Sequence, residues 1–244
     1  GANSVATNTA VGANALDDSV TGTHNVAIGN AAMGANTSGG YNVAVGSLAL
    51  DANTTASYNT ALGYGSLSAN STGANNTAVG EQALNASTTS NNNTAVGKSA
   101  LASNTTGTQN TAVGSLALDA NTTSNNNSAF GTSALGANTG SQNTALGSQA
   151  LLANTTGSDN VAVGMNALVS NTTADDNTAM GFLALQANTT GANNVAVGSL
   201  ALDANTTASG NTALGYNALS EVQTNTGLTA VGYRALAVSN GGNN

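Results

Sequence analysis

The feature that most constrains this chain is a five-residue string, Asn-Thr-Ala-Val-Gly, which returns at a fixed interval along the sequence. The interval is 17 residues, except for one of 16, and the copies begin at Asn8, Asn25, Asn42, Asn59, Asn76, Asn93, Asn110, Asn127, Asn143, Asn160, Asn177, Asn194, Asn211 and, with leucine in place of asparagine, Leu228. Such periods are typical of solenoids, in which each repeat forms one coil and buries its apolar face only against its neighbours. We therefore predict an all-β fold, a parallel β-roll or β-solenoid of about fourteen 17-residue coils.

The composition does not change from one end of the chain to the other, and no linker interrupts the repeat. Residues 1–244 are therefore predicted to form a single repeat array rather than two packed domains. Solenoids need polar caps at their ends, and neither end of this sequence has one. We expect the chain to be an excerpt from a longer fibre, or its ends to be covered by other parts.

The charge and the cysteine content bear on the function classes. The formal net charge is -8, and Lys98 and Arg234 are the two basic residues, so nucleic acid and anionic membrane surfaces are not expected partners. The absence of cysteine rules out disulfides and thiolate metal sites. No apolar run approaches the length of a membrane span, so we expect no direct membrane insertion in this segment. These features suit an extracellular protein, displayed on a cell surface or a virion surface.

The first five positions of each repeat, counted from the asparagine, are predicted to form a short strand. Alternation places positions 2 and 4 on one face of the strand. Position 4 is always large and apolar, and we expect these side chains to fill the inside of the coil: Val11, Ile28, Val45, Leu62, Val79, Val96, Val113, Phe130, Leu146, Val163, Met180, Val197, Leu214 and Val231.

Position 3 is alanine in every copy, from Ala10 to Ala230, and lies on the opposite face of the predicted strand. A solvent-facing position in an internal repeat should vary among polar residues, so an unvarying alanine indicates that something packs closely against it. The alternative is that alanine fills a tight place within its own chain.

The rest of the repeat reads as a corner, a second apolar contact and a turn. Glycine at position 5 suits a corner where φ is positive or another backbone comes close. The Ala-Leu pair at positions 8 and 9 should form a stacked column. Positions 11 to 17, typified by residues 187–193, are rich in asparagine, threonine and glycine, which favour turns.

The sequence contains no arrangement that indicates catalysis. His24 is the only histidine and is most simply a turn residue, and the acidic residues are scattered over different coils. The pairs Asp17-Asp18 and Asp175-Asp176 fit solvated turns better than calcium ligands. No phosphate-binding loop is present. We therefore expect a non-enzymatic protein with no catalytic residues, no cofactor and no metal.

The string Asn25-Val26-Ala27-Ile28-Gly29 and its copies resemble the head repeats of YadA-type trimeric autotransporter adhesins, and the resemblance covers nearly the whole chain. In that family three β-rolls pack side by side around a three-fold axis. The resemblance implies a side-by-side homotrimer whose interface is the alanine column: Ala27, Ala44, Ala61, Ala78, Ala95, Ala112, Ala129, Ala145, Ala162, Ala179, Ala196 and Ala213.

Three functions follow as expectations. The first is an extracellular fibre or adhesin shaft or head, which forms a stiff surface projection and binds an unknown surface ligand or receptor through many repeated sites. The second is an ice-binding β-solenoid that uses stacked threonine pairs such as Thr54-Thr55, Thr105-Thr106 and Thr122-Thr123. The third is a phage tail-fibre segment, because similar repeats resemble those of tail-fibre proteins.

Overall fold

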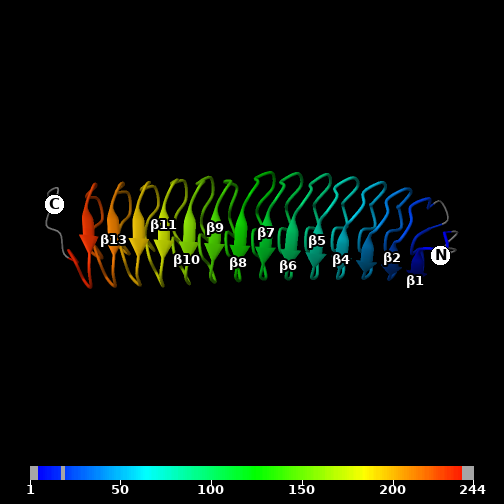
Figure 1. Ribbon diagram of the computed structural model, residues 1–244, viewed down its shortest axis with the longest axis horizontal. Coiled ribbons are helices and arrows are strands. Elements are labelled where there is room, and N and C mark those ends of the chain that lie inside the picture. Colours follow the sequence, from blue (N-terminus) through cyan, green and yellow to red (C-terminus); the bar gives the residue numbers. More distant parts are fainter. Residues whose placement is uncertain (1–4, 18–19, 238–244) are drawn as a thin grey trace. The chain divides into compact units, whose positions relative to one another are not determined.

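A computed structural model describes residues 5–17 and 20–237 and shows an all-β parallel β-solenoid, with no helix among these residues. The chain divides into two compact units, residues 1–125 and residues 126–244. Figure 1 shows that each repeat contributes one strand and one returning loop.

Each strand has three residues, and consecutive strands within a unit pair in parallel. The first unit contains β1 (Thr9–Val11), β2 (Val26–Ile28), β3 (Val43–Val45), β4 (Thr60–Leu62), β5 (Thr77–Val79), β6 (Thr94–Val96) and β7 (Thr111–Val113). The second contains β8 (Ser128–Phe130), β9 (Thr144–Leu146), β10 (Val161–Val163), β11 (Thr178–Met180), β12 (Val195–Val197), β13 (Thr212–Leu214) and β14 (Thr229–Val231). Equivalent repeat positions lie opposite each other, as Ala95 and Ala112 do between β6 and β7.

The prediction of one short strand per repeat is confirmed, although the strand covers positions 2 to 4 rather than 1 to 5. The predicted leucine column is also confirmed: Leu50, Leu101 and Leu185, all at position 9, are fully buried. The apolar core of each unit is therefore narrow and consists mainly of this column with the alanines of positions 3 and 8.

The assignment of the two strand faces was wrong. The alanines of position 3 lie inside the coil with no exposed surface and so cannot contact a partner chain: Ala27, Ala44, Ala61, Ala78, Ala95, Ala112, Ala129, Ala145, Ala162, Ala179, Ala196 and Ala213. The large apolar side chains of position 4, predicted to fill the coil, point outward instead, and Leu62 remains 46% exposed. The reason is the limited space inside the coil. In most coils a leucine at position 9 and two asparagines occupy the interior, which leaves room for a methyl group at position 3.

Two columns of buried asparagine stabilise most coils. At position 1, Asn59 accepts a hydrogen bond through Oδ1 from the backbone N–H of Asn76 in the next coil (2.9 Å), and its Nδ2 donates to the carbonyl of Gly73 (2.8 Å). At position 12, Asn70 donates through Nδ2 to the same Gly73 carbonyl (2.9 Å) and to Asn53 Oδ1 in the preceding coil (3.2 Å). Asparagine thus supplies the hydrogen bonds that buried turn backbone requires.

The corner at position 5 requires glycine, as predicted. Gly97 has φ of +133°, and a Cβ there would lie 2.6 Å from the carbonyl oxygen of Gly114 in the next coil. Both the backbone conformation and the close approach of the neighbouring coil therefore exclude a side chain. Positions 7, 9 and 17 also adopt positive φ, mostly without glycine; Leu101 has φ of 51°.

Candidate interaction surface

The outward side chains of position 4 form a row of apolar residues, here called the outer row, on the solvent face of each unit's sheet. In the first unit, Ile28 and Leu62 are exposed and the valines of β5 to β7 are half-buried. In the second unit, Phe130, Leu146 and Met180 are exposed. Because the strands pair in register, these side chains stand one coil apart along a single face.

The outer row is flanked by the side chains of position 2, which are threonine or valine in most coils and also point outward. Val43 and Val195 are exposed members of this flank. A sheet face that combines valine, isoleucine, leucine, phenylalanine and methionine with almost no charge is unusual for solvent contact. Contiguous apolar surface of this kind marks a site of interaction with another macromolecule.

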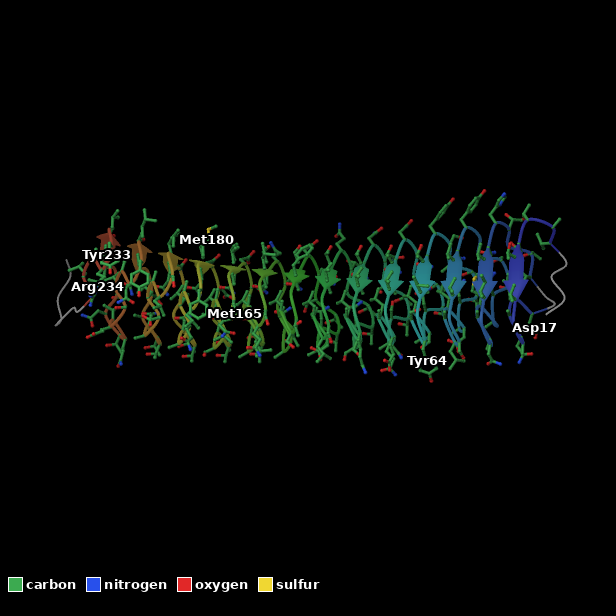
Figure 2. All side chains as sticks on the ribbon, turned by 90° about the horizontal axis from the view of Figure 1, so that it is seen from below. Asp17, Tyr64, Met165, Met180, Tyr233 and Arg234 are labelled. Carbon is green, nitrogen blue, oxygen red and sulfur yellow. The ribbon has the colours of Figure 1, made fainter. Side chains whose placement is uncertain are left out.

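A second group of apolar side chains follows the glycine corner, at position 6. It comprises Tyr64 in the first unit and Met165, Phe182, Tyr216 and Tyr233 in the second, all of them exposed. Figure 2 shows Met180 of the outer row at the edge of the ribbon where the strands lie, and Met165 of position 6 away from that edge, over the body of the ribbon. The glycine corner at position 5 thus separates the two groups.

Aromatic side chains at equivalent positions of consecutive coils stack on one another. His24, Tyr41 and Tyr58 share position 17, with ring centroids 4.8 and 5.2 Å apart in turn. Tyr216 and Tyr233 share position 6 at 5.4 Å. His24 does lie in a turn, as predicted, but its place in a stack was missed. The sequence could have indicated this stack, because residues 17 apart lie in adjacent coils of a solenoid with a 17-residue period.

The threonine pairs split into one bonded and one exposed residue. The first threonine donates its hydroxyl to the backbone carbonyl of the next coil, as from Thr54 to Ser71 (3.1 Å) and from Thr105 to Thr122 (3.1 Å). The second, such as Thr55 or Thr106, is exposed. The first threonines therefore act in the hydrogen-bond ladder between coils.

Ionisable groups are sparse and dispersed. Burial raises the pKa of the carboxyl groups of Asp51, Asp119 and Asp203, which share position 10, although bonds from their own and the following backbone N–H groups oppose the shift. Glu81 and Lys98 form an exposed ion pair at 3.4 Å. Among residues 5–17 and 20–237, no three histidine, cysteine, aspartate or glutamate side chains gather where they could hold a metal ion.

Of the acidic pairs noted in the sequence, the members that the structure describes, Asp17, Asp175 and Asp176, take no part in such a cluster. Asp175 Oδ1 accepts a hydrogen bond from the backbone N–H of Ser158 (2.7 Å), which is a structural role between coils. Asp176 is exposed. Asp18 lies outside the described residues.

No family model matches the chain, and no curated protein or solved structure is significantly similar to it. Within the described residues, no helix has the length and apolar character needed to cross a membrane. Because the comparisons identify no site, the candidate site is the outer row, which is distinguished by its apolar composition.

Proposed function

We propose that this chain is a non-enzymatic segment of an extracellular fibre or adhesin, in which three parallel copies pack side by side through their outer rows. The assembly gives a stiff projection from a cell or virion surface, and its repeated outer faces offer many equivalent sites to a surface ligand or receptor. Attachment then gains strength from multivalency rather than from a single pocket.

The observation that carries this proposal is the exposed outer row. Each coil places one large apolar side chain on the solvent face of the sheet, where a lone chain would leave it in water. Burial contributes about 1.5–3 kcal/mol for a fully exposed side chain of this size and less for the valines that are already half-buried, and some contribution recurs at every coil. Three copies around a common axis bury each row against two others. The resemblance to YadA-type head repeats supports three copies rather than two.

The variation along the outer row favours contact with protein. Val79, Phe130 and Met180 differ in shape at equivalent positions, so the row is not uniform. Side chains of different size can interdigitate between copies of the same chain, because each copy presents the same sequence at the same height. The low charge of the face also suits a core of an interface.

The test is the mass in solution, by sedimentation equilibrium or light scattering. We expect three chains of 23.3 kDa each. A double variant, Leu62→Lys with Val79→Lys, places two charges in the outer row of β4 and β5 and should yield single chains, because an unpaired charge is costly to bury.

The matched control is Asn75→Lys with Asn92→Lys, which adds the same charges to exposed positions of the same two coils. It should keep the mass of the unmodified protein. A single-chain mass for the unmodified protein would contradict the proposal. So would a double outer-row variant that stays trimeric while its circular dichroism is unchanged.

Ice binding is the second candidate, and the observation that favours it is the column of exposed second threonines, which includes Thr55, Thr106 and Thr123. The hydroxyls of the first threonines are engaged in the ladder between coils, so the candidate depends on a single column of free hydroxyl and methyl groups. Thermal hysteresis in dilute buffer separates the two functions: a fibre segment should show none, and an ice-binding protein should show it in proportion to concentration.

A further inference from the structure

Four of the five tyrosines of the chain lie in two pairs, and each pair joins consecutive coils of one unit. The rings of Tyr41 and Tyr58 are 5.2 Å apart between centroids and inclined by 7°. Those of Tyr216 and Tyr233 are 5.4 Å apart and inclined by 15°. The fifth, Tyr64, stacks on no ring in the part of the chain that the structure describes.

The backbone keeps both pairs in place. The N–H of Tyr58 donates to the carbonyl of Gly40 in the preceding coil (3.2 Å), directly beside Tyr41. The N–H of Arg234 donates to the carbonyl of Tyr216 (2.8 Å), directly beside Tyr233. Ladder bonds therefore hold the backbones of each pair at the spacing of adjacent coils, so the two rings stay within reach of each other while the coils are paired.

All four rings are open to reagents in solution. Tyr41 and Tyr58 are 52% and 60% exposed, and Tyr216 and Tyr233 are 45% and 75% exposed. The other face of Tyr41 is covered by His24, at 4.8 Å and parallel, so the aromatic partner of Tyr41 available for coupling is Tyr58. Both tyrosine pairs therefore combine close ring spacing, nearly parallel rings and exposure to reagents.

We infer that Tyr41–Tyr58 and Tyr216–Tyr233 are sites of oxidative cross-linking, at which a peroxidase with hydrogen peroxide joins the two rings as dityrosine. Each phenol loses one electron and one proton to become a phenoxyl radical. The two radicals then form one carbon–carbon bond between ring positions adjacent to the hydroxyl groups, and the two ring hydrogens leave as protons as the phenols re-form. The pair loses two hydrogen atoms in all, and one hydrogen peroxide is reduced to two waters.

The consequence is a covalent staple between adjacent coils, in a chain that has no cysteine from which to build a disulfide. Each staple closes a loop of one repeat and so restricts the unfolded chain in the manner of a disulfide. The inference does not depend on the proposed fibre function, because the geometry belongs to each unit by itself.

The test is oxidation of the dilute, folded protein by peroxidase and hydrogen peroxide, read by dityrosine fluorescence. The folded protein should give at least roughly tenfold more dityrosine than the same protein in urea, because the rings are already placed side by side. Cleavage after Lys98 and Arg234 in denaturant then separates Tyr41, Tyr58 and Tyr64 from Tyr216 and Tyr233. Coupling within pairs leaves these fragments unlinked, and each should fluoresce and lack two hydrogen atoms by mass spectrometry.

Two variants make the result specific. Tyr41→Phe with Tyr233→Phe removes one phenol from each pair and should reduce dityrosine roughly tenfold. Tyr64→Phe removes the unstacked phenol and should leave the yield unchanged, and after oxidation this variant should unfold at a higher urea concentration than before. Equal loss in both variants, fragments joined to each other, or a yield no higher than in urea would each overturn the inference.

Discussion

The position 12 asparagine column is interrupted at Ser87, and this interruption leads to a sharp prediction. In most coils the position 12 asparagine donates through Nδ2 to Oδ1 of its counterpart in the preceding coil, as Asn53 does to Asn36 (2.8 Å) and Asn121 does to Asn104 (2.9 Å). Serine at position 87 is too short for this bond. The Oδ1 atom of Asn70 is consequently buried without a hydrogen-bond partner.

We expect Ser87→Asn to stabilise the fold. The new Nδ2 would donate to Asn70 Oδ1, and the new Oδ1 would accept from Asn104, whose Nδ2 bonds to its own coil at Gly107 (3.0 Å). A buried unsatisfied acceptor costs about 1–3 kcal/mol, and a hydrogen bond contributes about 0.5–1.5 kcal/mol. Ordering a longer side chain opposes these gains by about 1 kcal/mol. The substitution also removes the buried hydrogen bond between the hydroxyl groups of Ser87 and Ser90, which costs about 0.5–1.5 kcal/mol. The central values of these terms leave a net gain of about 1 kcal/mol.

The neighbouring serine does not prevent this substitution. Ser90 stands at position 15 of the same coil, where most coils have glycine or alanine. Asn121 and Ser124 show that asparagine at position 12 and serine at position 15 fit together, with the Nδ2 of Asn121 bonded to the Ser124 carbonyl (3.1 Å). The substitution therefore copies an arrangement that the chain already contains.

The assay is urea unfolding at a fixed protein concentration, supported by hydrogen exchange of the amides in residues 84–88. The control is Ser87→Val, because Val222 occupies the same repeat position and is buried there. Valine adds apolar volume but no hydrogen bond. If Ser87→Asn is no more stable than Ser87→Val or the unmodified protein, then the account of the asparagine column is wrong.

The remaining predictions concern single positions of the coil. Ala95→Leu should destabilise the coil itself by about 1–3 kcal/mol through overpacking. A lowered urea midpoint or a broadened unfolding transition of the isolated chain would show it. Gly97→Ala should lower stability by about 1–3 kcal/mol, because its methyl group meets the backbone of Gly114 at positive φ, and an unchanged melting temperature would contradict this. The folded pKa of Asp51 is raised above 3.8, so the folded state holds its proton to higher pH than the unfolded state, and stability falls as the pH rises through this window. Asp51→Asn, which copies Asn85 at the same position, should remove the contribution of Asp51 to that fall, while Asp119 and Asp203 keep theirs. It should stabilise the protein by under about 1 kcal/mol at neutral pH, as a smaller difference between the urea midpoints at acidic and neutral pH would show.

The sequence was sufficient for the repeating features of the fold. The interval of 17 residues predicted one coil per repeat, the glycine of position 5 predicted the corner, and Leu101 and its equivalents predicted a buried column. These features follow from local chemistry, since strand alternation, positive φ and turn preference are properties of a few adjacent residues. These features could be recognised in the sequence because each coil is a near copy of the next.

The candidate surface was the part that sequence reasoning placed on the wrong face. Alternation correctly separated Ala95 from Val96, but size suggested that valine lies inside. The sequence analysis assigned asparagine to the start of the strand and to the turn, and its burial in columns at positions 1 and 12 comes from the structure. The stacking of Tyr41 and Tyr58 could have been predicted by applying the 17-residue period to exposed positions as well as to the core.

The sequence by itself determined the period, the strand, the corner and the turn of each coil, because these depend on residues that are neighbours in the chain. Only the tertiary structure decided which side of the strand faces inward. The space available inside depends on the side chains that the rest of the coil contributes. In most repeats a leucine at position 9 and two asparagines leave room only for a methyl group at position 3. The larger side chains of position 4 are therefore on the outside, where they form the outer row.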